Sequence, residues 1–180
     1  REEYPDVELH AITFDYGQRH IVELDAAREV ARLVGCQSHE VLTLPQGILQ
    51  GTSPLVDPTQ ELEQYADHHS LPGGLEKTFV PMRNQLFLTL AANRAYVKGC
   101  RALVTGVCQE DFGGYPDCRE VFIAAIEDAC KLGTFTDRPF EIFTPLMFMT
   151  KAESVLLALR LPGCYSALAY THTAYDGAYP

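Results

Sequence analysis

One loop holds most of the side chains in this chain that could do chemistry. Residues Thr105 to Glu120 read TGVCQEDFGGYPDCRE and combine carboxylates, an arginine, two thiols and a Gly-Gly pair. The loop follows an apolar run at 102–104 and precedes a segment with helical spacing. In open α/β sheets, ligands bind beyond the carboxyl ends of the strands. Its composition and position therefore predict a binding or catalytic site.

Three further polar clusters fall at similar junctions. FDYGQRH (14–20) follows a predicted strand, TFVPMRN (78–84) precedes a predicted helix, and TPLMFMTKAE (144–153) follows another strand. The helix dipole alone disfavours cations at helix starts. A bound anion, held by a cation together with free helix N–H groups, would explain such cations and predicts a phosphorylated ligand such as a nucleotide. The cations near predicted helix starts are Arg19, Arg83, Arg119 and Lys151.

The sequence gives no sign of a protein nucleophile. It shows no Ser-His-Asp arrangement, and a catalytic thiol would need a base beside it. No histidine lies near Cys108 or Cys118 in the sequence, so both are predicted to be small buried hydrophobic residues.

Alternating strands and helices must position these clusters. Gly35, Gly99 and Gly133 are predicted to end helices, and Thr150-x-x-Glu153 is a capping box. The inward face of the second helix is predicted to carry Leu86, Phe87, Leu90, Ala91 and Val97. Strands are predicted over 8–14, 38–44, 101–105 and 140–143, and helices over about 19–34, 83–98, 121–133 and 150–161.

This alternation indicates an α/β fold with a parallel sheet and helices on both faces, as one domain over residues 1–180. Residues 45–77 are rich in Pro, Gly, Ser and acids and are too long for a plain connection. We expect them to form an irregular insert or a lid.

Composition narrows the classes of function. A net charge of −10 and a pI of about 5.0 argue against broad electrostatic binding of nucleic acid. No apolar run approaches the roughly 20 residues that span a bilayer, and no signal peptide opens the chain. Six cysteines without a CxxC pair are typical of reduced thiols. We expect a cytoplasmic protein without nucleic-acid or membrane partners.

The four motifs, in their order along the chain, resemble the successive motifs of the 7-cyano-7-deazaguanine (preQ0) synthase family of queuosine biosynthesis. The resemblance runs from about residue 8 to about residue 177, and DFGGYPDCR is its most specific part. It implies a three-layer, Rossmann-like fold of the adenine nucleotide alpha-hydrolase or ATP pyrophosphatase kind. It also implies an ATP-dependent ligase, with Mg²⁺, that converts 7-carboxy-7-deazaguanine and ammonia to the nitrile and releases AMP and pyrophosphate.

The resemblance implies roles for particular residues. Arg119 would bind the substrate carboxylate bidentately, and Asp111 would bind Mg²⁺ or the polar edge of the substrate. Asp117 would belong to the same catalytic loop, and Lys151 would act beside phosphate. Contacts to the nucleotide are implied for Tyr16, Gln18, Arg83, Asn84, Gly106 and Lys151.

Each of these residues also has an ordinary structural explanation, which the sequence leaves open. The alternatives are an N-cap with Asp117–Glu120 spacing, a plain helix start at Arg83 and Asn84, a solvated first-turn Lys151, and a turn at Tyr16 and Gln18.

The chain also departs from the family pattern. The family opens with a Ser-Gly-Gly-x-Asp-Ser phosphate loop that has no counterpart here, so we expect an N-terminally truncated fold that is inactive alone. The family's first zinc cysteine corresponds to Ala174 in THTAYDG (171–177), which puts zinc in doubt because alanine cannot bind a metal. The resemblance is compatible with a homodimer.

Two other functions stay open. One is an amidoligase of the same fold that acts on another carboxylate. The other is a non-catalytic module that binds a nucleotide or base and lacks the phosphate loop.

Overall fold

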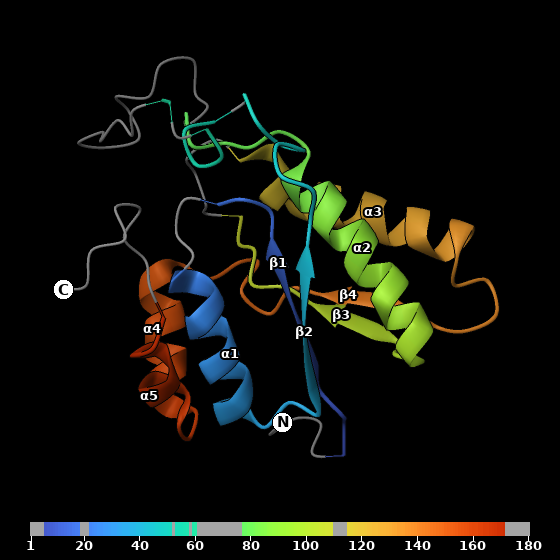
Figure 1. Ribbon diagram of the computed structural model, residues 1–180. Coiled ribbons are helices and arrows are strands. Elements are labelled where there is room, and N and C mark those ends of the chain that lie inside the picture. The colour runs from blue at the N-terminus through green and yellow to red at the C-terminus, as the bar shows by residue number, and fades with distance from the viewer. Residues whose placement is uncertain are drawn as a thin grey trace. The chain divides into compact units, whose positions relative to one another are not determined.

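The structure is a computed structural model, and it describes residues 6–18, 22–51, 53–57, 59–60, 77–109 and 115–171. Its strands and helices alternate as predicted, which confirms an α/β fold (Figure 1). The short elements η3 and α5 were not predicted. The elements are β1 (His10–Asp15), α1 (Val22–Val34), β2 (Ser38–Thr43), α2 (Arg83–Lys98), β3 (Ala102–Val104), the 3-10 turn η3 (Pro116–Cys118), α3 (Glu120–Gly133), β4 (Glu141–Phe143), α4 (Lys151–Arg160) and α5 (Cys164–Leu168).

The chain divides into two compact units. Unit 1 comprises Arg1–Leu62 and Ala158–Pro180, and unit 2 comprises Glu63–Leu157. Each unit contains one pair of parallel strands. Two such units can belong to one domain, so the single domain over residues 1–180 stays a prediction.

In unit 1, β1 and β2 pair in parallel, with His10 opposite Ser38 and Asp15 opposite Thr43. Helix α1 connects them and contacts β1, as a parallel crossover requires. It buries Leu24 on one face, and it ends at Gly35, whose φ of 71° is the left-handed conformation that glycine adopts at low cost. Helix α5 packs against α1.

The described part of the predicted insert, 45–77, consists of turns. Ser53 is fully buried, and its carbonyl accepts hydrogen bonds from the N–H groups of Val56 and Asp57. The Asp57 carboxylate in turn accepts from Thr59 and Gln60. This segment is therefore locally ordered by its own hydrogen bonds. Residues 61–76 lie outside the described residues, and the lid stays a prediction.

In unit 2, β3 and β4 pair in parallel, with Ala102 opposite Glu141, and α2 lies beside α3 (Figure 1). One hydrophobic core joins these elements. It comprises Leu88, Ala92 and Ala95 of α2, Ile123 of α3, Ile142 of β4, and Phe135, Phe140 and Met147 of the connecting loops.

The predicted inward face of α2 was only partly correct. Ala91 is buried, but Val97 is 63% exposed, and the side chains that reach the core are Leu88, Ala92 and Ala95. Small alanine side chains let two helices approach closely. The face of α2 that carries Ala92 and Ala95 is therefore buried, although other faces carry larger apolar residues.

The boundary between α3 and β4 is held by one carboxylate. Glu127 of α3 accepts a hydrogen bond from the backbone N–H of Ile142 at 2.6 Å and forms an ion pair with Lys131. Burial would raise the pKa of Glu127, but the hydrogen bonds from Lys131 and Ile142 together lower it. The residue is therefore held as a carboxylate that ties the helix to the strand.

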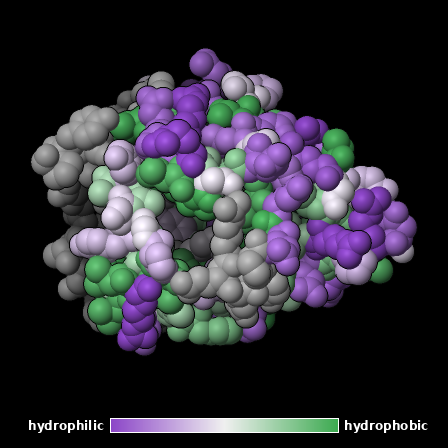
Figure 2. Space-filling model, turned by 90° about the horizontal axis from the view of Figure 1, so that it is seen from below, coloured by the Kyte–Doolittle hydropathy of each residue, from purple (hydrophilic) through white to green (hydrophobic). Residues whose placement is uncertain are grey.

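The surface exposes apolar side chains on several elements. Those exposed by more than half include Val104 of β3, Val121 and Leu132 of α3, and Leu156 of α4. On the face drawn in Figure 2, apolar side chains reach the surface in separate places among polar ones. Scattered apolar exposure of this kind is normal for folded proteins. Within the described residues, no helix has the length and apolar character needed to cross a membrane.

Candidate functional site

Two motifs that the sequence marked separately meet within unit 2. The hydroxyl groups of Thr78 and Tyr115, 37 residues apart, form a hydrogen bond. The rings of Phe79 and Tyr115 lie with centroids 5.9 Å apart at a tilted angle of 53°. The start of TFVPMRN thus lies against the end of the Gly-Gly loop.

The contact continues at Asn84, the second residue of α2. Its side-chain amide nitrogen donates to the Asp117 carbonyl at 3.4 Å and lies 3.5 Å from the Cys118 sulfur. Asp117 and Cys118 are both buried, at 8% and 9% exposure. No local pattern in the sequence indicates this pairing, because the partners are 33 residues apart in the chain.

The start of α2 has no cap of its own. Met82, its N-cap residue, adopts a left-handed conformation with φ 64° and ψ 3°, and no side chain caps the helix from that position. Among the described residues, Met82 is the one non-glycine residue with a positive φ. The first turn also contains no acidic residue. The Arg83 N–H donates to the Val80 carbonyl at 3.2 Å, so a preceding backbone carbonyl, and no side chain of Met82, satisfies this group.

Asp117 brings an acidic side chain to this helix start, whose first turn contains none. Burial raises the pKa of Asp117, whereas the backbone N–H of Asn84 and the charge of Arg83 act to lower it. The backbone N–H of Asp117 itself also lowers it, but burial is the largest influence and the pKa of Asp117 is raised overall. The first two lowering influences come from the first turn of α2, so the carboxyl lies beside that turn.

Arg119 lies on the outer side of the same loop. It is exposed and is the N-cap residue of α3, and its carbonyl accepts hydrogen bonds from the N–H groups of Phe122 and Ile123 at 3.1 Å. The alternative in which Asp117 caps this helix is wrong, because Asp117 lies within η3. The Arg119 side chain is exposed to solvent, and its contact with the substrate stays a prediction.

The loops after β3 and β4 run together. The N–H of Thr105 donates to the carbonyl of Phe143 at 3.0 Å, and that of Gln109 donates to Met147 at 2.8 Å. Gly106 between them is exposed, and a β-carbon there would meet no atom within 4 Å. The polar groups after the two strands therefore share one edge, as the parallel order predicted.

Lys151 begins α4 and lies within the predicted capping box Thr150-x-x-Glu153, which the structure confirms. The Thr150 N–H donates to the Glu153 carboxylate at 2.8 Å, and the Glu153 N–H donates to the Thr150 hydroxyl at 3.0 Å. Lys151 is exposed in the first turn. Its contact with phosphate stays a prediction.

Tyr16 and Gln18 lie in unit 1, in the turn after β1. The Gln18 amide oxygen accepts from the Tyr16 N–H at 2.9 Å, and its nitrogen donates to the Phe14 carbonyl at 3.1 Å. Gln18 is 8% exposed, so its amide holds the turn together. Those bonds use one donor and one acceptor of the amide, and the nucleotide contact predicted for both residues stays a prediction.

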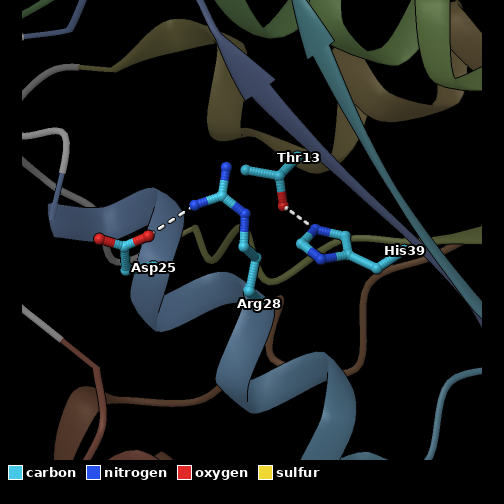
Figure 3. A network of polar contacts seen from close by, with 4 residues as sticks. All are labelled: Thr13, Asp25, Arg28 and His39. Carbon is cyan, nitrogen blue, oxygen red and sulfur yellow. Dashed lines mark hydrogen bonds and ion pairs between the residues drawn. The ribbon is translucent and has the colours of Figure 1, made fainter.

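A second polar network in unit 1 was not predicted. The Thr13 hydroxyl and His39 Nε2 are hydrogen-bonded at 2.8 Å, and Arg28 of α1 extends toward these strands while paired with Asp25 (Figure 3). Burial, followed by the charge of Arg28, lowers the pKa of His39. The residues come from β1, β2 and α1, so spacing along the chain could not reveal them.

Some predicted residues cannot be placed. Arg19, Asp111 and Ala174 lie outside the described residues, as does the Gly-Gly pair at 113–114. Within the described part, no group of three or more His, Cys, Asp or Glu side chains could hold a metal ion. Cys108 and Cys118 are buried, as predicted.

Parallel strands joined by helices, with polar loops after the strands, place the protein in the α/β class. A family model described as queuosine biosynthesis protein QueC matches residues 2–179. The chain belongs to this QueC family, which confirms the family that the motifs indicated.

Three relatives of this chain carry the same name. The chain is 49% identical over 173 residues to the 7-cyano-7-deazaguanine synthase of Gloeobacter violaceus, and the match covers 94% of this chain and 73% of that protein. It is 47% identical to that of Chromobacterium violaceum, over 96% of this chain and 70% of that protein. The synthase of Laribacter hongkongensis is 44% identical, over 96% and 72%.

Proposed function

We propose that this protein is an ATP-dependent ligase that converts 7-carboxy-7-deazaguanine and ammonia to 7-cyano-7-deazaguanine. One observation carries the proposal: the TFVPMRN and YPDCR motifs meet in unit 2 of a chain whose relatives, up to 49% identical, are named 7-cyano-7-deazaguanine synthases. The fold proposed with it is the three-layer ATP pyrophosphatase type.

The chemistry requires two activations. A carboxylate resists attack by ammonia, so its oxygen first displaces pyrophosphate from ATP to give an acyl adenylate. Ammonia then attacks the carbonyl carbon, AMP leaves, and an amide forms. A second ATP activates the amide oxygen with release of pyrophosphate, and loss of AMP and protons leaves the nitrile. Positioning and charge stabilisation, rather than a protein nucleophile, carry such steps.

The residues divide into two groups in this proposal. Arg119, with its exposed guanidinium, binds the substrate carboxylate in two parallel hydrogen bonds, and Asp111 contacts the substrate edge or Mg²⁺. Mg²⁺ would arrive with the ATP phosphates, which supply its oxygen ligands. The residues proposed to contact the nucleotide are Tyr16, Gln18, Arg83, Asn84, Gly106 and Lys151.

The proposal is tested by AMP formation and by the Arg119→Ala variant. Because the chain is expected to be inactive alone, the test uses a full-length protein that carries the family's phosphate loop, which should form AMP only when 7-carboxy-7-deazaguanine is present. Arg119→Ala should raise the KM for that substrate about tenfold to a hundredfold, because charge-assisted hydrogen bonds are lost, and leave the KM for ATP within about twofold. Arg101→Ala is the matched control, since Arg101 is also exposed in unit 2.

Three results would count against the proposal. If Arg119→Ala raised the KM for ATP as much as the KM for 7-carboxy-7-deazaguanine, the loop would not select the carboxylate substrate. AMP formation with a different carboxylate would indicate the amidoligase alternative. Nucleotide binding without any AMP would indicate the non-catalytic module.

A further inference from the structure

We propose that Asn84 and Asp117 form a clasp that positions Arg119, and that neither residue touches the reacting atoms. The inference rests on the proposed function, because it concerns the loop that would bind the carboxylate substrate. It replaces the catalytic role that the motifs alone assigned to Asp117, and it adds a positioning role to the nucleotide contact proposed for Asn84.

The first half of the clasp runs from the loop to the helix. Helix α2 begins at Met82 without a side-chain cap or an acidic residue in its first turn. An uncapped start leaves backbone N–H groups without intrahelical acceptors. Asp117 places a buried carboxyl beside this turn, where it faces the Asn84 N–H and the Arg83 charge. We infer that the Asp117 carboxyl caps this first turn, next to the contact between the Asn84 side chain and the Asp117 carbonyl at 3.4 Å.

The second half runs from the helix to the loop. The Asn84 amide nitrogen donates to the Asp117 carbonyl at 3.4 Å and lies 3.5 Å from the Cys118 sulfur. Asn84 therefore holds the backbone of Asp117, and the Asp117 carboxyl faces the backbone N–H of Asn84. Loss of either half should weaken the attachment of the turn Pro116–Cys118 to α2.

The direction of the side chains separates positioning from substrate contact. Asp117 is 8% exposed and faces α2, whereas Arg119, two residues later, is exposed. The Cys118 thiol, 4.0 Å from the Asp117 carboxylate, is buried as well. A buried anchor next to an exposed guanidinium fixes where that guanidinium can reach, because the backbone between them is short.

The decisive comparison is Asp117→Asn with Asp117→Ala. Asparagine keeps an acceptor oxygen and is as good a capping residue as aspartate, whereas alanine keeps none. Asp117→Ala should raise the KM for 7-carboxy-7-deazaguanine roughly tenfold with kcat and the KM for ATP within about twofold. Asp117→Asn should recover most of that loss. Asp128→Asn, at an exposed site on α3, controls for the change of charge.

The opposite pattern would overturn the inference. If Asp117→Asn lowers kcat as far as Asp117→Ala does, the charge or proton of Asp117 acts in the reaction itself. The clasp would then be incidental to catalysis.

A double-mutant cycle tests the clasp without any assay of activity. Asn84→Ala and Asp117→Ala should each lower the thermal unfolding midpoint, and the double variant should lower it by clearly less than the sum. Asn93→Ala, exposed on the same helix, should add independently to Asp117→Ala. Additive effects of Asn84 and Asp117 would contradict the clasp. If the wild-type protein forms no substrate-dependent AMP, the proposed function fails, while this cycle still decides the clasp.

Discussion

Met82 shows how a single residue marks the site through its backbone. A left-handed φ of 64° is unfavourable for a residue with a β-carbon, and such outliers cluster at functional sites. The motif TFVPMRN was noticed for its cations, but nothing in its letters predicted this conformation. The residue lies between Pro81 and the first turn of α2.

Replacing Met82 with glycine should therefore stabilise the protein. Glycine adopts this conformation without the β-carbon penalty, and the Met82 side chain is 59% exposed and contributes little packing. We expect the free energy of unfolding to rise by about 0.5–1 kcal/mol, measured by urea denaturation. Val97→Gly, at an exposed interior position of α2, should lower it by a similar amount. A similar decrease in the free energy of unfolding in Met82→Gly and Val97→Gly would show that Met82 is not strained.

Residue types and spacing predicted which segments carry polar groups but not which side chains meet. Arg119 and Lys151 are exposed, as residues that bind a ligand from solvent must be. The contacts of Asn84 with Asp117 and of Thr78 with Tyr115 join positions more than thirty residues apart, so no local pattern encodes them. Asp117 was consequently assigned to catalysis before its burial was known.

At the scale of elements, the sequence predicted the ends of helices well and the buried face of a helix poorly. The predicted helix over 83–98 matches α2, because Gly99 with φ 73° ends it where the sequence indicated. The Thr150–Glu153 box was also confirmed at the start of α4. The buried face of α2 was partly wrong, and η3 and α5 were missed, because three to five residues give too short a periodic signal.

Glu127 makes the contact between α3 and β4 sensitive to acid. Its pKa is lowered overall, so its contribution to stability is full above its ordinary pKa of 4.5 and is lost as the pH falls through the lower folded-state value. We expect Glu127→Gln to lower the free energy of unfolding at neutral pH by about 1–2 kcal/mol, because its side chain is only 22% exposed.

The pH dependence separates this effect from general acid denaturation. The difference between wild type and Glu127→Gln, measured by urea denaturation, should shrink as the pH falls from neutral to about 3. Glu8→Gln, at an exposed loop position, should show a small difference throughout. A difference for Glu127→Gln that stays constant with pH would exclude a role for its charge.

At the scale of the whole molecule, the alternation of strands and helices was sufficient to predict an α/β protein with parallel strands. The two strand pairs, each within its own compact unit, were not predicted, because pairing depends on contacts between distant parts of the chain. The order of four motifs indicated the family, and the match over residues 2–179 confirmed it.

The most direct test of the central claim is the fate of nitrogen from ammonia. A full-length protein that carries the family's phosphate loop would be incubated with 7-carboxy-7-deazaguanine, ATP and ¹⁵N-labelled ammonium, and the products would be separated and identified by mass spectrometry. The proposed function predicts 7-cyano-7-deazaguanine that carries one labelled nitrogen, together with AMP and pyrophosphate. Unchanged substrate, or AMP formed without any labelled nitrile, would contradict it.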